Sequence, residues 1–149
     1  MRFTLDSNLL VYSVDRRNGR KHGAAIGIVS RAMGKDCVVL VQALAEFYHV
    51  VTRERIMTKP DASSMVHEWA NSFNVGDAAD ADALSAAMMA SVSGRFQFFD
   101  ALRLATARQA GCVAAVSEDM APGSNLNGVA IVGAFSADGT ISPATAAIL

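Results

Sequence analysis

Four acidic residues, far apart in the sequence, take similar places relative to the strands and helices that the sequence predicts. The first follows a short apolar strand, the second lies in a helix after a β-branched strand, the third opens a helix, and the fourth follows another buried strand; they are Asp6, Glu46, Asp100 and Asp119. Each alone has a simpler explanation as a cap, turn residue or solvated acid. Because ligands bind at the carboxyl ends of parallel strands, the pattern predicts that all four meet at that edge.

Four ionised carboxylates in one place would repel one another and raise each other's pKa values. A divalent cation relieves that repulsion, and Mg²⁺ and Mn²⁺ are the ions that prefer carboxylate oxygens. Such an ion can activate water and stabilise the leaving oxygen in phosphodiester hydrolysis, so no nucleophilic side chain is required. Cys37 and Cys112 lack a CxxC partner and a nearby His, and we expect free buried thiols rather than a zinc site.

The elements that would position these acids alternate between short apolar runs and helical patterns. We expect strands at residues 3–5, 38–41, 113–116 and 129–132, and helices at 9–12, 22–33, 42–55, from Asp61 onward, 79–92 and 100–110. Asp61 is the expected N-cap of its helix, Gly76-Asp77 a turn, and Gly111 the residue that ends the helix begun by Asp100. Nearly continuous apolar strands alternating with helices indicate one α/β domain with a parallel sheet covered on both faces.

Composition narrows the class of protein. A chain of 149 residues with 52% apolar residues is suited to one compact domain. Its apolar runs are shorter than a membrane span needs, and the opening MRFTLDSNLL has no continuous apolar signal core. We therefore expect a cytoplasmic protein that makes no use of a membrane.

Charge is unevenly distributed although the net charge is only −1. Residues 1–59 hold ten Lys/Arg and five Asp/Glu, whereas residues 60–149 hold three and nine. This asymmetry fits a basic rim beside an acidic pocket that handles a polyanion, and it equally fits two solvated surfaces. The candidates for contacts with a phosphate backbone are Arg16, Arg17, Arg20, Lys21 and Arg103. The first four also fit a solvated loop, and Arg103 also fits a residue that balances the charge of the acids.

Five segments resemble, in order, the PIN-domain ribonucleases, and among them the VapC-type toxins of bacterial toxin–antitoxin pairs. They are TLDSNLLVY (4–12), QALAEFYHV (42–50), FFDALRLATARQAGC (98–112), VSEDM (116–120) and GVAIVGAF (128–135). The family often has Asn-Pro before the closing Phe, where this chain has Gly133-Ala134 before Phe135.

The resemblance implies a three-layer α/β/α fold with a mostly parallel sheet. It places a single PIN-like domain at residues 1–135, followed by a weakly patterned C-terminal extension, 136–149, that fits a flexible tail. The implied activity is a Mg²⁺- or Mn²⁺-dependent endoribonuclease that hydrolyses RNA. Its acidic site would be Asp6, Glu46, Asp100 and Asp119, with Asn8 and Ser117 beside the metals. The implied partners are a second copy of the chain and an antitoxin whose C-terminal segment covers the pocket.

Other readings of the same acids remain open. A DNA-directed nuclease is the nearest, because an acidic core cannot by itself read the 2′-hydroxyl of RNA. A PIN-like protein that only binds a partner is the second. A phospho-acceptor receiver domain also clusters acids around Mg²⁺, but it needs a Lys after a later strand, and no Lys follows Lys59.

Overall fold

The computed structural model describes residues 1–149 and contains one six-stranded sheet with strand order β3-β2-β1-β4-β6-β5. The strands are β1 (Phe3–Leu5), β2 (Cys37–Leu40), β3 (Asn74–Gly76), β4 (Ala114–Ser117), β5 (Asn125–Leu126) and β6 (Val129–Gly133). All neighbouring strands run parallel except β5, which pairs antiparallel with β6. The helices are α1 (Ser7–Val14), η1 (Arg16–Asn18), α2 (Arg20–Ala32), α3 (Val41–Arg53), α4 (Lys59–Ser72), α5 (Ala81–Val92), α6 (Phe98–Gln109) and α7 (Pro143–Ile148).

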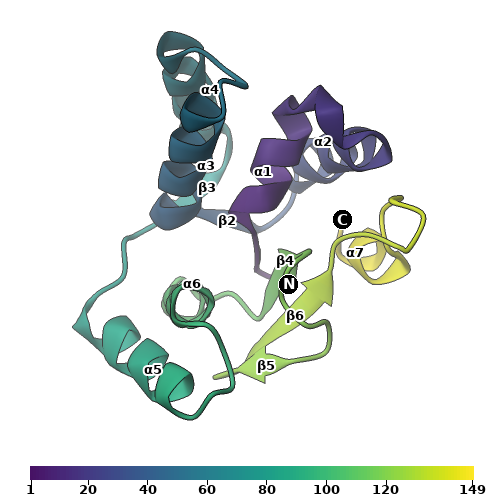
Figure 1. Cartoon of the computed structure of the whole chain (residues 1–149). Coiled ribbons are helices and arrows are strands. Elements are labelled where there is room, and N and C mark those ends of the chain that lie inside the picture. The colour runs from purple at the N-terminus through teal and green to yellow at the C-terminus, as the bar shows by residue number, and fades with distance from the viewer.

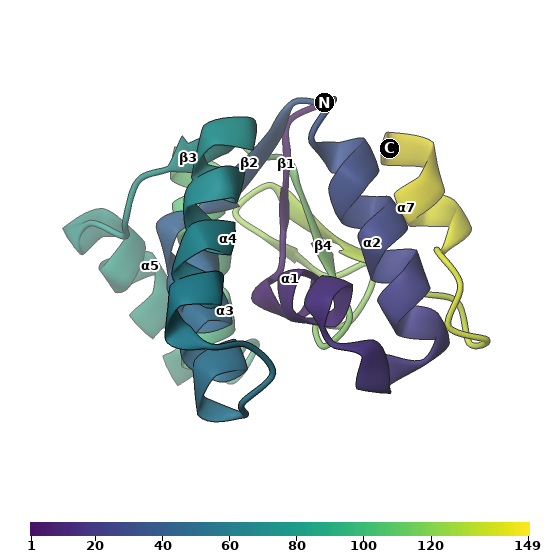
Figure 2. The ribbon, with the colours of Figure 1, turned by 90° about the horizontal axis from the view of Figure 1, so that it is seen from above.

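Helices cover both faces of this sheet, as the sequence predicts (Figure 1). Helices α1 to α4 and α7 lie over one face, and α5 and α6 lie over the other (Figures 1 and 2). Alternate residues of the central strands point to opposite faces of the sheet and pack into two separate hydrophobic cores. Phe3 and Val116 join the larger core with Phe47, whereas Ala115 joins the smaller one with Leu104. Strands β1, β2 and β4 are therefore buried on both faces, which explains why their sequences are mostly apolar.

The chain changes direction across the sheet between β1 and β4. From β1 it moves outward through β2 to β3, and it returns through α5 and α6 on the other face to place β4 beside β1. Ligands of open α/β sheets bind outside the carboxyl ends of the strands at such a switch point. Asp6 follows one of these two strands and Asp119 follows the other.

Several boundaries differ from the sequence predictions. Val41 is the first residue of α3 rather than the last of a strand. Thr58, not Asp61, is the N-cap of α4, because its hydroxyl accepts a hydrogen bond from the Asp61 backbone N–H and Pro60 occupies the first turn. Gly76 lies in the edge strand β3 rather than in a turn. A side chain there would collide with Leu40 and Val38, which explains why glycine occupies this position of the strand.

The C-terminal extension is packed against the domain, which differs from the flexible tail that its weak pattern suggests. Phe135 forms a β-bridge with Ile141, and the Thr145 hydroxyl donates a 2.8 Å hydrogen bond to the Gly133 carbonyl. Ser142 caps α7, and Ile148 and Leu149 pack against the larger core. Hydrogen bonds from Ser and Thr hydroxyls and the packing of a few apolar side chains together hold this segment in place.

Neither cysteine is bonded to another group, and both are buried. Burial raises the pKa of Cys112 to about 11 and raises that of Cys37 further, so both thiols are protonated at neutral pH. No helix is both long enough and apolar enough to cross a bilayer.

Candidate active site

Asp6 occupies the N-cap position of α1, directly after β1, but its side chain does not cap the helix. Its backbone N–H donates to the Val116 carbonyl, which fixes the residue against β4. The carboxylate instead accepts hydrogen bonds from Ser117 Oγ at 2.7 Å and from Ser7 Oγ at 3.3 Å, and its Oδ1 lies 2.7 Å from Arg103 Nη1. Only 3% of the Asp6 side chain is exposed, and each of its carboxylate oxygens contacts a neighbouring side chain.

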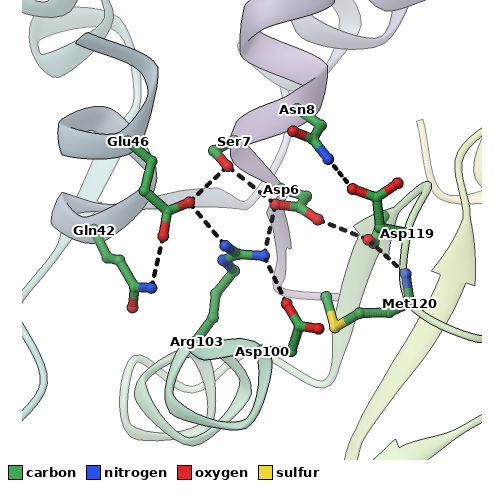
Figure 3. Close-up of polar contacts among 10 residues, drawn as sticks. Asp6, Ser7, Asn8, Gln42, Glu46, Asp100, Arg103, Asp119 and Met120 are labelled. Carbon is green, nitrogen blue, oxygen red and sulfur yellow. Dashed lines mark hydrogen bonds and ion pairs between the residues drawn. The ribbon is translucent and has the colours of Figure 1, made fainter. Parts of the chain in front are cut away.

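Glu46 lies in the second turn of α3 and points toward Asp6 (Figure 3). Its Oε2 accepts from Ser7 Oγ at 2.7 Å and from Arg103 Nη2 at 2.8 Å, while Oε1 accepts from Gln42 Nε2 at 2.8 Å. Ser7 therefore bridges the two acids, and Gln42 fixes the rotamer of Glu46 from one helical turn earlier.

Helix α6 supplies both an acidic residue, Asp100, and a positively charged residue, Arg103. The helix begins at Phe98, with Gln97 at the N-cap, so Asp100 lies in the first turn and is not the cap that the sequence suggests. A carboxylate there is favoured by the helix dipole. Arg103, one turn later, is buried and lies between three acids (Figure 3). Its Nη1 is 2.7 Å from Asp6 but 3.6 Å from Asp100, so the contact with Asp100 is the looser one.

Asp119 lies two residues beyond β4 and is exposed. Its carboxylate accepts a hydrogen bond from the side-chain amide of Asn8, which belongs to α1 (Figure 3). Ser117 Oγ accepts from the Met120 backbone N–H while donating to Asp6, and thus shapes the turn that carries Asp119. The structure brings all four predicted acids to the same edge of the sheet, with Asn8 and Ser117 among them.

Two of the four acids, Asp100 and Asp119, have raised pKa values. Partial burial raises the pKa of Asp100, and the charges of Asp6, Asp119 and Glu46 raise it further although Arg103 opposes them. Partial desolvation by the surrounding side chains raises the pKa of Asp119 although the residue reaches the surface, and repulsion from Asp6 and Glu118 raises it further. These carboxylates therefore carry negative charge that the protein's own cation does not fully balance.

This imbalance predicts how stability depends on pH in the absence of divalent ions. Since the folded-state pKa of Asp100 lies above its unfolded value, ionised Asp100 destabilises the fold above that folded-state pKa, and the cost disappears as the pH falls through it. Asp100→Asn should therefore raise the Tm at pH 7 in EDTA, and the gain should shrink toward pH 4. Thermal unfolding followed by circular dichroism measures the difference.

Asp138 provides a control of opposite sign. Hydrogen bonds from the Thr140 side chain and backbone lower the pKa of its carboxyl group, so its ionised form supports the fold at neutral pH. Asp138→Asn should leave the Tm at pH 7 unchanged or slightly lower. A lower Tm for Asp100→Asn at pH 7 would contradict the interpretation that the acids repel one another.

The predicted phosphate-binding residues lie in different surroundings. Arg16, Arg17 and Arg20 are exposed at η1 and the start of α2, although Arg17 pairs with Asp15 at 2.9 Å. Lys21 pairs with Glu118, the neighbour of Asp119, and its Nζ lies 5.8 Å from the Tyr12 and Phe135 ring centroids. RNA contacts by these four residues stay a prediction.

Arg103 differs from the other basic residues because only 8% of its side chain is exposed. Both of its Nη atoms face carboxylates. Of the two roles that the sequence allows it, the geometry favours balancing the charge of the acids over contact with a phosphate.

Ser7 and Gln42 are the site residues that sequence reasoning missed. Ser7 directly follows Asp6 and looks like an ordinary turn residue, and Gln42 looks like a solvated residue of a first helical turn. The spacing of Gln42 and Glu46, four residues apart on one helix, is the one signal that could have paired them.

The donor set fits a hard divalent cation, because every ligand available at the site is an oxygen of a carboxylate, hydroxyl or carboxamide group. As they stand, no three His, Cys, Asp or Glu side chains are arranged around one ion position. The Arg103 guanidinium lies among three of the four acids. Arg103 balances Asp100 and Asp119 least. A cation would have to be held by these two acids, with Asp6 as a third ligand.

Comparison with known proteins places this chain in a family. The PIN domain model matches residues 3–121, a segment that contains all four acids. The chain belongs to the PIN domain family. Its three-layer α/β/α architecture, predicted from the sequence, is thereby confirmed. No curated protein matches the PIN domain described here.

Solved structures share the fold of this PIN domain at low sequence identity. VapC20 of Mycobacterium tuberculosis, described as a toxin that cleaves the sarcin–ricin loop, is 18% identical with a TM-score of 0.58, over 76% of this chain and 86% of that one. DNA-bound VapBC of Salmonella typhimurium is 14% identical with a TM-score of 0.59, over 89% and 98%. VapBC2 of Rickettsia felis, bound to a promoter DNA fragment, is 14% identical with a TM-score of 0.61, over the same shares.

Proposed function

We propose that this PIN domain is a Mg²⁺- or Mn²⁺-dependent endoribonuclease of the VapC toxin type. The observation that carries the proposal is the convergence of Asp6, Glu46, Asp100 and Asp119 at the switch point of a PIN fold. The toxins among its structural neighbours support the choice of RNA as substrate and of an antitoxin as partner. A cytoplasmic location and a homodimeric state belong to the same proposal.

The residues of the site have distinct tasks under this proposal. Asp6, Asp100 and Asp119 would hold the cation, and Ser117 and Asn8 would keep Asp6 and Asp119 turned toward it. When bound, a divalent cation supplies activated water and neutralises charge that develops on the phosphodiester. Glu46, tied to Ser7, Gln42 and Arg103, orients Arg103 within the site. Without a cation the excess negative charge of the acids repels an RNA phosphate.

Removal of the metal should therefore stop the reaction without unfolding the protein. In EDTA, we expect cleavage of RNA oligonucleotides to fall by at least about 100-fold, because cation catalysis supplies several kcal/mol of barrier reduction. Added Mn²⁺ or Mg²⁺ should restore it. Gel analysis of end-labelled RNAs, with circular dichroism on the same samples, measures both quantities.

A comparison of different nucleic-acid substrates distinguishes the competing functions. Structured and single-stranded RNAs are compared with DNAs of the same sequence. Cleavage of DNA alone would favour a DNA-directed nuclease, and absence of cleavage of either polymer with Mn²⁺ bound would favour a PIN domain that only binds a partner. EDTA-resistant cleavage of RNA would contradict the proposed chemistry.

A further inference from the structure

Arg103 is the unusual member of the site, because it is a buried cation in a place where the proposed chemistry needs a metal. Its side chain is 8% exposed. Its Nε is buried without a hydrogen-bond partner, which costs free energy. Arg103 is therefore stabilised by its ionic contacts with the acids, and those contacts indicate what it does.

Those contacts are concentrated on one half of the acidic cluster. The guanidinium bridges Asp6 and Glu46 through two separate nitrogens, at 2.7 and 2.8 Å. Ser7 Oγ lies 3.3 Å from Asp6 Oδ1 and 2.7 Å from Glu46 Oε2, so it contacts the same two acids. The space between these two carboxylates is thus already filled by a positive charge and a hydroxyl donor.

The other half of the cluster has only a looser ion pair and one neutral donor. Asp100 lies 3.6 Å from Arg103, beyond hydrogen-bond distance, and Asp119 accepts only from the neutral amide of Asn8. Four carboxylates and one guanidinium leave an excess of three negative charges. One divalent cation at Asp100 and Asp119, with Asp6 shared between it and Arg103, reduces that excess to a single negative charge.

We propose that Arg103 takes the place of a second metal ion, so that this chain binds a single divalent cation. Nucleases with two metals hold them about 3.5–4 Å apart between shared carboxylates. Here the guanidinium bridging Asp6 and Glu46 neutralises that end of the cluster and blocks an ion from it. The inference rests on the proposed metal site but not on the identity of the nucleic acid.

The number of Mn²⁺ ions bound per chain tests the inference without RNA. The free Mn²⁺ signal in electron paramagnetic resonance gives this number in a titration. We expect one ion for the native chain, two for Arg103→Met, and one for Arg103→Lys, which keeps the charge. Arg108→Met is the matched control, since Arg108 is an exposed arginine later in the same helix, and it should bind one ion.

Arg103→Met removes the partner of a buried carboxylate and can unfold the metal-free protein. Arg103→Gln keeps N–H donors beside Asp6 without the charge, and it should also bind two ions. Its Tm should rise more on addition of Mn²⁺ than the Tm of the native chain does.

Two results would overturn the inference: equal Mn²⁺ numbers for the native chain and both neutral variants, or no bound Mn²⁺ in any of them. A native chain that binds one ion, with variants that bind two, but that cleaves no RNA would contradict the proposed function and leave the role of Arg103 intact.

Discussion

Asp6→Asn should lower RNA cleavage by about three orders of magnitude while the protein stays folded. Asp6 is a proposed metal ligand whose two oxygens contact Ser117 and Arg103, so its loss would remove a ligand and disturb the alignment of the rest. A loss of about 4 kcal/mol of transition-state stabilisation corresponds to about a thousandfold lower rate. The substitution is nearly isosteric, and Arg103 keeps Glu46 and Asp100 as partners.

The measurement is the single-turnover rate of RNA cleavage at saturating Mn²⁺. Asp36→Asn is the matched control, because Asp36 is a partly exposed aspartate that pairs with Arg2 at the opposite, amino-terminal edge of the sheet. It should cleave at the native rate. Cleavage by Asp6→Asn within a few-fold of the native rate would rule out the proposed site.

Phe47→Ala should have the largest effect on stability. Phe47 is completely buried beside Glu46, and its ring packs edge-on against Trp69 of α4 with 4.6 Å between centroids. Truncation of a buried phenylalanine costs about 3–5 kcal/mol, which is a large share of the stability of a domain of this size. Because α3 also carries Glu46, the surviving folded protein should hold its acidic site less rigidly.

Urea unfolding followed by tryptophan fluorescence measures this cost, since Trp69 is the one tryptophan of the chain. Phe99→Ala is the control, because the Phe99 side chain is 64% exposed and its truncation should change the free energy of unfolding by less than about 0.5 kcal/mol. Equal effects of the two substitutions would show that the α3–α4 contact does not anchor the fold.

Sequence reasoning predicts those parts of the fold that local chemistry determines. The apolar runs around Val39 and Ala115 identify central strands because burial on both faces leaves no room for polar residues. Acids at strand ends are predictable for a related reason, since parallel strands must present their carboxyl ends together. This is why Asp6, Glu46, Asp100 and Asp119 could be selected without coordinates.

What could not be predicted depends on pairing at long range. Strand β3 forms because its backbone completes the edge beside β2, although Gly76 gives no strand signal. Ser7 carries no local sign that it will meet Asp6 and Glu46, and the sequence leaves Arg103 open between phosphate contact and charge balance. Their contacts are set by the packing of α1 and α6 at the sheet edge. The order of α7 likewise depends on hydroxyl contacts with Gly133 rather than on a helical pattern.

Strand β1 pairs with β4, which is synthesised much later, and this pairing has a consequence for biosynthesis. Phe3 lies beside Ala114, and Ser117 donates its hydrogen bond to Asp6 across 111 positions of the chain. Contacts of such sequence separation form late, because loop closure must precede them. A nascent polypeptide emerging from the ribosome therefore carries Asp6 without its partner Ser117 until β4 has been synthesised, and the acidic site of the proposed nuclease would stay incomplete until then.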